Sequence, residues 1–227
     1  MDEQWPPTRF LLTLMNDEVE RRDQKQLGKL IARSDIHPDK TFESFDFRFN
    51  PKINESVLRE LALGGYIAKK ESVFLLGPSG VGKSHLASAL GHEACRRGHE
   101  VQFHRLNTLL QWIKAGDADS SRYKRLQQVI RIPLLILDDF GLKPIDPSEQ
   151  ADLYEIICER HERASLIITS NRDFNEWPMI FTNPLMASAA MDRLVHHAIK
   201  ILIEGKSYRM EEFAQRSKNL TNPLEKK

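Results

Sequence analysis

The segment Gly77-Pro-Ser-Gly-Val-Gly-Lys83-Ser84 constrains this chain more than any other, because it matches the spacing GxxxxGK followed by Ser or Thr. The apolar run Val73 to Leu76 precedes it and predicts a buried strand, and a helical pattern over Lys83 to Arg97 follows. Glycines let such a turn curl so that its N–H groups point inward, and the helix adds its positive end. A turn that only connects strand to helix is the alternative, but this context favours a phosphate-binding loop.

The residue types of this loop suit a nucleoside triphosphate and its metal. Lys83 would place a positive charge at the β and γ phosphates, and the Ser84 hydroxyl is a ligand for Mg²⁺. We therefore expect ATP and Mg²⁺ to bind here. The residues expected to contact the nucleotide in this region are Gly77, Pro78, Ser79, Gly80, Val81, Gly82, Lys83, Ser84 and His85.

A second apolar run, Leu134-Leu-Ile-Leu, ends in the two carboxylates Asp138 and Asp139. This is the arrangement of a Walker B strand, in which Asp138 would hold Mg²⁺ through water and Asp139 would orient or deprotonate the attacking water. Related ATPases usually have Glu at the second position, and the shorter side chain bears on the hydrolysis rate rather than on binding. Two aspartates in a solvated turn are the alternative, but the phosphate-binding loop favours the Walker B arrangement.

A third apolar run, Leu166 to Thr169, ends in Ser170-Asn171-Arg172. If this strand lies between those that carry Gly77 and Asp138, Asn171 would lie by the γ-phosphate and help to hold the attacking water. The alternative is a helix N-cap, because Ser170, Asn171 and Asp173 are all good capping residues.

Strand-like runs alternate with helical patterns from about residue 40 onward, which predicts an α/β fold with a parallel sheet and helices on both faces. Before that, residues 10 to 33 predict a helical segment, residues 41 to 51 an extended segment packed on a neighbour, and residues 54 to 69 a helix. We expect an N-terminal helical segment at 1–39, the main domain at 40–210 and a C-terminal tail at 211–227.

Composition and charge argue against a chain-wide nucleic-acid surface, a cysteine-based metal site and a membrane span. The 227 residues carry 33 basic and 32 acidic side chains, so any nucleic-acid surface must be a local patch. The two cysteines, Cys95 and Cys158, lie far apart without metal-ligand spacing, which indicates reduced thiols. No apolar run approaches the roughly 20 residues of a membrane span, and the acidic start is unlike a signal peptide. We expect a cytoplasmic protein without a membrane partner.

Two further motifs complete a resemblance, namely Met191-Asp-Arg193-Leu-Val-His-His-Ala198 and Gly205-Lys-Ser-Tyr208-Arg209. With the three strand-end motifs, in this order, residues 40 to 210 resemble the IstB-like branch of AAA+ ATPases, which are relatives of the DnaC helicase loader. The resemblance implies an AAA+ core with a five-stranded parallel sheet and without a C-terminal helical lid. It also implies that Arg193 is an arginine finger reaching a neighbouring subunit and that Arg209 is a second sensor; a surface salt bridge is the alternative for Arg193.

Family members usually carry a helical stretch before the segment that corresponds to Phe10, so we expect this chain to begin within the N-terminal domain. The resemblance implies an ATPase that assembles on double-stranded DNA as a homo-oligomer, with ATP sites at subunit interfaces, and directs a partner transposase. Without a lid, γ-phosphate charge is uncompensated within one subunit, so an arginine supplied in trans would stabilise the transition state. Alternatives are a helicase loader, a small-molecule kinase, and a nucleotide-gated binding module with negligible turnover.

Basic clusters are candidate DNA contacts, although each is also compatible with a solvated helix face. They are Arg96-Arg97, Arg122 with Tyr123, Lys124 and Arg125, and the tail residues Arg216, Lys218, Lys226 and Lys227. His196-His197 suggests a metal site, but adjacent histidines project differently and the sequence reveals no carboxylate or cysteine partner for them. The sequence therefore favours no metal there.

Overall fold

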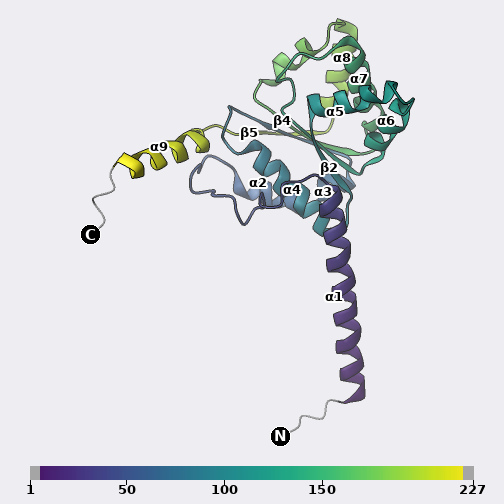
Figure 1. The fold of residues 1–227 in the computed structure, drawn as a ribbon, viewed down its shortest axis with the longest axis vertical. Coiled ribbons are helices and arrows are strands. Elements are labelled where there is room, and N and C mark those ends of the chain that lie inside the picture. Colours follow the sequence, from purple (N-terminus) through teal and green to yellow (C-terminus); the bar gives the residue numbers. More distant parts are fainter. Residues whose placement is uncertain (1–5, 222–227) are drawn as a thin grey trace.

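The computed structural model describes residues 6–221, and the side chains of residues 6–217. Its centre is a five-stranded parallel sheet with the order β2-β3-β4-β1-β5, which confirms the predicted sheet and places β4 between β1 and β3 (Figure 1). The strands are β1 (Ser72–Leu76), β2 (Val101–Arg105), β3 (Leu134–Asp138), β4 (Ser165–Ser170) and β5 (Ala198–Leu202).

The strands share one register, so their carboxyl ends meet at one edge of the sheet. Leu76 of β1 pairs with Ser170 of β4, and Arg105 of β2 pairs with Asp138 of β3. β3 and β4 are buried along their whole length, as expected for central strands rich in Leu and Ile that are covered on both faces. The residues that follow β1, β3 and β4 are therefore neighbours in space.

Alternate strand residues pack into two separate cores, one on each face of the sheet. Phe74, Leu76 and Leu137 contribute to one core, and Val73 and Leu75 contribute to the other. The first core lies under α5 (Leu106–Lys114), α6 (Arg122–Arg131), α7 (Pro147–Arg160), the 3-10 helix η2 (Phe174–Ile180) and α8 (Pro184–Val195), with the short η1 (Ala115–Asp117) between α5 and α6. The second lies under α2 (Glu55–Ala62), α3 (Gly65–Ala68) and α4 (Lys83–Arg96).

Helices project from this body at both ends of the chain (Figure 1). The predicted N-terminal helix is α1 (Pro7–Arg33), of which only the last turns pack on the body, through Leu27, Leu30 and Ile31. Among the residues described after β5, one helix forms, α9 (Tyr208–Thr221), and it begins before the tail predicted at 211–227. No helix in the described part of the chain combines the length and apolarity that a bilayer span requires.

Two local predictions were wrong. The helix predicted over 54–69 is interrupted at Gly64, which adopts the left-handed φ of 78° and separates α2 from α3. Residues 41–50 form successive turns rather than an extended segment, although their aromatic side chains do pack on a neighbour, since Phe42, Phe45 and Phe47 contact the second core. The chain therefore folds back against the sheet edge where the phosphate-binding loop begins.

Candidate functional site

A cavity of about 400 Å³ lies at the carboxyl edge of the sheet. Most of the residues predicted to form a nucleotide site contribute to its wall, namely Ser79, Gly80, Val81, Gly82, Lys83, Ser84, His85, Asp138, Asp139, Asn171 and Arg209. Gly77 and Pro78 lie in the same loop but outside this wall, and Arg193 lies elsewhere. The fold thus brings together side chains from the ends of β1, β3 and β4 with the start of α9.

The glycines of the loop permit close approach of the chain segments on either side. Gly80 and Gly82 adopt left-handed φ angles of 84° and 98°. A Cβ at Gly80 would lie 2.0 Å from the Ser207 Oγ, and one at Gly82 would lie 2.6 Å from the Phe45 ring. The loop is therefore held between the turns of residues 41–50 and the segment before α9, and neither glycine position tolerates a side chain without displacement of a neighbour.

Lys83 lies at the first position of α4 with only 6% of its surface exposed. Its Nζ donates hydrogen bonds to the Gly77 carbonyl at 2.8 Å and the Pro78 carbonyl at 2.7 Å. Burial lowers the pKa of the Lys83 ammonium, and the charges of Asp138 and Asp139 act in the opposite direction. The lysine thus ties the loop to itself through the Gly77 and Pro78 carbonyls.

Thr169, which the sequence analysis did not select, links the Asp138 carboxylate to the backbone of Asp139. Its hydroxyl donates to the Asp138 Oδ1 and accepts a hydrogen bond from the Asp139 backbone N–H at 3.2 Å. Asp138 is only 4% exposed, so this hydrogen bond satisfies one of its oxygens in a buried setting. The pairing of Thr169 with Asp138 follows from the adjacency of β4 and β3, which no local spacing reveals.

Asp139 has an unusual backbone conformation and a shifted pKa. Its backbone has a φ of 59°, a left-handed value that aspartate tolerates better than most residues. Burial, and next the charge of Asp138, raise the pKa of the Asp139 carboxyl above its usual value. Arg105, at the end of β2, is a further residue missed in the sequence; its Nε lies 4.0 Å from the Asp139 Oδ2 and lowers the same pKa.

Asn171 follows β4 and is exposed in the cavity wall. The alternative that Asn171 caps a helix is wrong, because the N-cap of η2 is Asp173, whose carboxylate accepts the Asn175 backbone N–H at 3.0 Å. The Asn171 amide is thus not used as the cap of this helix.

Aromatic side chains that the sequence analysis did not assign to the site form another part of the wall. Phe49 and Tyr208 meet edge to face with ring centroids 5.0 Å apart, and Phe45 contacts the His85 ring at the same distance. His85 is held by the Thr41 carbonyl, 2.8 Å from its Nε2. Each of these contacts joins parts of the chain that are distant in sequence, so the aromatic wall becomes visible only in the fold.

The start of α9 contacts the phosphate-binding loop directly. The Tyr208 backbone N–H donates to the Gly80 carbonyl at 3.0 Å, and the Arg209 guanidinium donates to the Ser79 Oγ at 3.1 Å. Arg209 therefore lies at the cavity of its own chain.

Arg193 lies on α8, outside the cavity wall. Its guanidinium donates to the Ala189 carbonyl at 2.8 Å and lies 6.0 Å from the Tyr154 ring centre. Among the described residues it forms no ion pair that would support the surface salt bridge considered as its alternative. A role for Arg193 at a nucleotide would therefore have to be exercised on another subunit.

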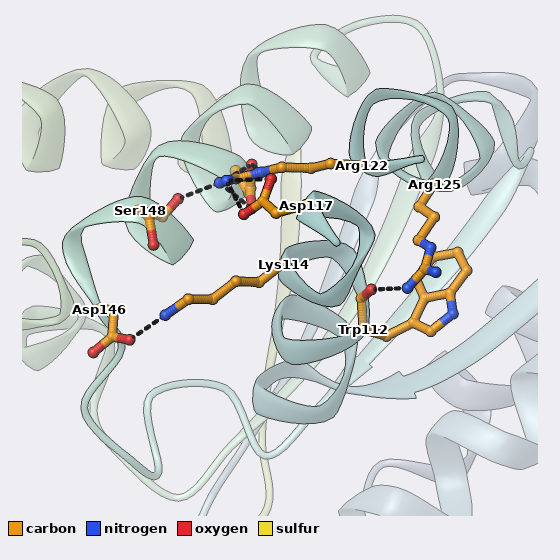
Figure 2. A network of polar contacts seen from close by, with 8 residues as sticks. Trp112, Lys114, Asp117, Arg122, Arg125, Asp146 and Ser148 are labelled. Atoms are coloured by element: carbon orange, nitrogen blue, oxygen red, sulfur yellow. Dashed lines mark hydrogen bonds and ion pairs between the residues drawn. The ribbon is translucent and has the colours of Figure 1, made fainter. Parts of the chain in front are cut away.

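The basic cluster at 122–125 is largely neutralised within the fold (Figure 2). Arg122 forms ion pairs with Asp117 and Asp152, each at 3.0 Å, and donates to the Ser148 carbonyl. Arg125 pairs with Asp119 at 3.2 Å, donates to the Trp112 carbonyl and packs over its indole. These arginines join α5, α6 and α7, which leaves exposed Tyr123 and Lys124 as the free members of the cluster.

The other basic clusters are also partly paired. Arg96 contacts Glu43 and Glu93, and Arg97 donates to the Ala62 carbonyl. In the tail, Arg216 pairs with Glu212, while Lys226, Lys227 and the side chain of Lys218 lie outside the described residues. The described basic residues therefore form no continuous track of unpaired charge at these positions.

The donors at the cavity fit a hydrated magnesium ion. Ser84 and Asp138 offer hydroxyl and carboxylate oxygens, which are the hard ligands that Mg²⁺ prefers. The glycine-lined loop fits phosphate groups, because its backbone comes close without side chains in between.

Comparison with known proteins identifies close sequence relatives. A family model described as IstB-like ATP binding protein matches residues 1–216. A Geobacillus stearothermophilus protein named for insertion sequence IS5376 and for ATP binding is 35% identical over 203 residues, covering 89% of this chain and 81% of the relative. A similarly named Mycobacterium tuberculosis insertion-sequence protein, Rv3427c, is 40% identical and covers 88% of this chain and 80% of the relative.

Solved structures share the fold at lower sequence identity. DnaA from Aquifex aeolicus bound to AMPPCP superposes with a TM-score of 0.62 and 21% identity, covering 85% of this chain and 59% of that one. The DnaC helicase loader superposes with a TM-score of 0.56 and 19% identity, covering 65% of this chain and 86% of that one. These likenesses show that the chain shares the fold of DnaA and of the DnaC helicase loader.

Proposed function

Because this chain belongs to the IstB-like ATP binding protein family, we propose that it binds and hydrolyses ATP with Mg²⁺ in the cavity between β1, β3 and β4. The observation that carries the proposal is the convergence of the glycine loop, Lys83 and the Asp138–Asp139 pair on one cavity. Relatives named for ATP binding support the same ligand.

In this proposal, Lys83 exchanges the Gly77 and Pro78 carbonyls for phosphate oxygens. The exchange replaces two neutral acceptors by charged ones, and charge-assisted hydrogen bonds are roughly twice as strong. Ser84 and Asp138 would hold Mg²⁺, and Thr169 would fix the orientation of Asp138. Bound Mg²⁺ supplies neutralisation of the phosphate charge.

Asp139 is the proposed base. It would accept a proton from the attacking water as the water oxygen bonds to the γ-phosphorus and the bond to the bridging oxygen breaks, which leaves ADP and phosphate. Its raised pKa makes the carboxylate a stronger base than an exposed aspartate. Asn171 would orient the same water, and Arg209 would contact the phosphates from the start of α9.

The aromatic wall suits the purine base. Phe45, Phe49 and Tyr208 offer apolar ring surfaces in the cavity wall, against which a base can pack. Since Tyr208 comes from the start of α9, this one helix would partly enclose the nucleotide in place of a lid domain.

Assembly is the remaining part of the proposal. We infer that Arg193 completes the ATP site of a neighbouring copy, that the oligomer assembles on double-stranded DNA, and that it directs a partner transposase. Relatives named for insertion sequences favour the transposase as partner. Helicase loading is the second candidate function, because the chain shares the fold of the DnaC helicase loader. Capture of a replicative helicase instead of a transposase would favour it.

ATP binding and hydrolysis test the proposal directly. Lys83→Ala is expected to abolish ATP binding, whereas Lys69→Ala, which removes an exposed lysine after α3, is expected to leave it unchanged. Hydrolysis by the unaltered protein is expected to rise with duplex DNA and with protein concentration. Full ATP affinity in Lys83→Ala would refute the assigned site, and a rate indifferent to DNA and concentration would refute assembly.

A further inference from the structure

His161, Glu162 and His196 form a second cluster of metal-ligating side chains. One ligand atom from each lies within 4.8 Å of the other two, and the His196 Nδ1 lies 3.5 Å from the Glu162 Oε1. The His161 and His196 rings stack with centroids 5.3 Å apart. The fold thus supplies His196 with the carboxylate and second imidazole that its neighbourhood in the sequence does not contain.

The cluster lies far from the nucleotide cavity. His161 follows α7 and precedes β4, and His196 follows α8 and precedes β5. Because the strands are parallel, these turns lie at the amino edge of the sheet, whereas the phosphate-binding loop follows the carboxyl end of β1. A strand of five or six residues separates the two edges by about 17–20 Å.

We propose that His161, Glu162 and His196 bind a zinc ion. Two imidazoles and a carboxylate form a ligand set that suits Zn²⁺, and three protein ligands leave a fourth tetrahedral position to water. Donors on a tetrahedral zinc stand roughly 3.3 Å apart, given bond lengths of about 2.0–2.1 Å. The His196–Glu162 pair already approaches this separation, and the side chains of both residues are more than half exposed. Rotation of these side chains can therefore bring the ligand atoms together.

The ion would connect two turns that strand pairing does not join. β4 and β5 lie on opposite sides of β1, so no strand pairing joins the turns before them, although α7 packs on α8. A shared ion would fix the end of α8 to the end of α7. Zinc is therefore expected to stabilise the folded chain, by an amount that grows with the logarithm of the ratio of zinc concentration to Kd.

Zinc titration of the untagged full chain without nucleotide, in competition with a chromophoric chelator, tests this site. We expect one Zn²⁺ per chain and a rise in Tm on zinc addition. His161→Gln, Glu162→Gln and His196→Gln are each expected to weaken binding about tenfold or more and to reduce the rise in Tm. His37→Gln, at an exposed histidine outside the cluster, is the matched control and is expected to bind as the unaltered chain does.

The nucleotide site provides the second control. Asp138→Asn removes the carboxylate proposed for Mg²⁺, and it is expected to leave the zinc affinity unchanged. Circular dichroism verifies that each variant folds. Zinc affinity that survives in folded His161→Gln and His196→Gln, or that disappears in folded Asp138→Asn, would overturn the proposal, whatever the outcome for ATP.

Discussion

At the scale of single residues, the groups around Asp139 set the pKa of the carboxyl that we propose as the base in hydrolysis. Arg105 lowers the pKa of this carboxyl, although burial and Asp138 raise it overall. Arg105→Ala is therefore expected to raise the pKa further, which moves the acidic limb of the hydrolysis profile to higher pH. The base acts when deprotonated, so activity is lost as pH falls through this pKa. An exposed pair worth about 0.2–1 kcal/mol corresponds to a shift of about 0.1–0.7 pH units.

The rate of ATP hydrolysis, measured against pH at saturating ATP, checks this shift. Arg131→Ala removes an exposed arginine at the end of α6, close to the opposite edge of the sheet, and serves as the control. An acidic limb at the same pH in Arg105→Ala and Arg131→Ala would mean that Asp139 does not set the limb or that Arg105 does not act on it.

The residues of the site differ in how far the sequence could reveal them. The glycine loop and the Asp138–Asp139 pair were predictable, because local spacing determines both. Thr169 and Arg105 were not selected, because their relation to the aspartates depends on which strands are neighbours. His161 and Glu162 illustrate the same limit, since they precede His196 by more than 30 residues and meet it only at the sheet edge.

At the scale of elements, the buried side chain of Arg160 connects α7 by hydrogen bonds to the end of α6 and the start of β4. It is 1% exposed, and burial lowers the pKa of its guanidinium to about 9, so it stays charged at neutral pH. Its Nη1 and Nη2 atoms donate to four backbone carbonyls, three of them at the end of α6 and one at the start of β4, whereas its buried Nε has no partner among the described residues. These acceptors are Val129, Ile130, Ile132 and Ser165.

Arg160→Met is expected to lower the free energy of unfolding by at least about 3 kcal/mol, because buried acceptors without a partner cost about 1–3 kcal/mol each. Arg163→Met is the matched control. It removes an exposed arginine paired with Glu159 one turn before it, and its expected effect is below about 0.5 kcal/mol. Denaturant unfolding of both variants measures the difference, and equal stabilities would show that the carbonyls find other partners.

The elements themselves were predictable where apolar periodicity was strong. The three runs selected in the sequence form β1, β3 and β4 where expected, because their Leu, Ile and Val side chains are buried on both faces of the sheet. α8 was missed, because its apolar residues mix with Ala and Ser between Asn183 and the histidines. The turns of residues 41–50 were taken for an extended segment, because alternating aromatics have the period of a strand, although here they contact the loop and α4.

At the scale of the whole molecule, the position of Arg193 bears on whether one copy of the chain contains every residue needed for hydrolysis or a second copy must supply one. The cavity wall contains Lys40, Lys83, Arg105 and Arg209 from the chain itself, and Arg193 is not among its residues. If a neighbouring copy supplies Arg193, hydrolysis requires contact between copies. Arg193→Ala should then bind ATP normally and hydrolyse it slowly even at high protein concentration.

Mixing of two inactive variants tests this sharing. An Arg193→Ala subunit keeps its own cavity, and a Lys83→Ala subunit keeps its Arg193, so an interface between them can contain one complete site. A site is complete only when an Arg193→Ala subunit supplies the cavity and a Lys83→Ala subunit supplies the arginine. With equal amounts of the two variants and random exchange, about a quarter of the sites meet both conditions. Hydrolysis is expected to recover toward that fraction upon mixing under exchange conditions.

Recovery must fail when Lys83→Ala is replaced by a chain that carries both substitutions, because that chain offers neither cavity nor arginine. Activity that stays absent in the first mixture, although the subunits exchange, would place the function of Arg193 within its own chain.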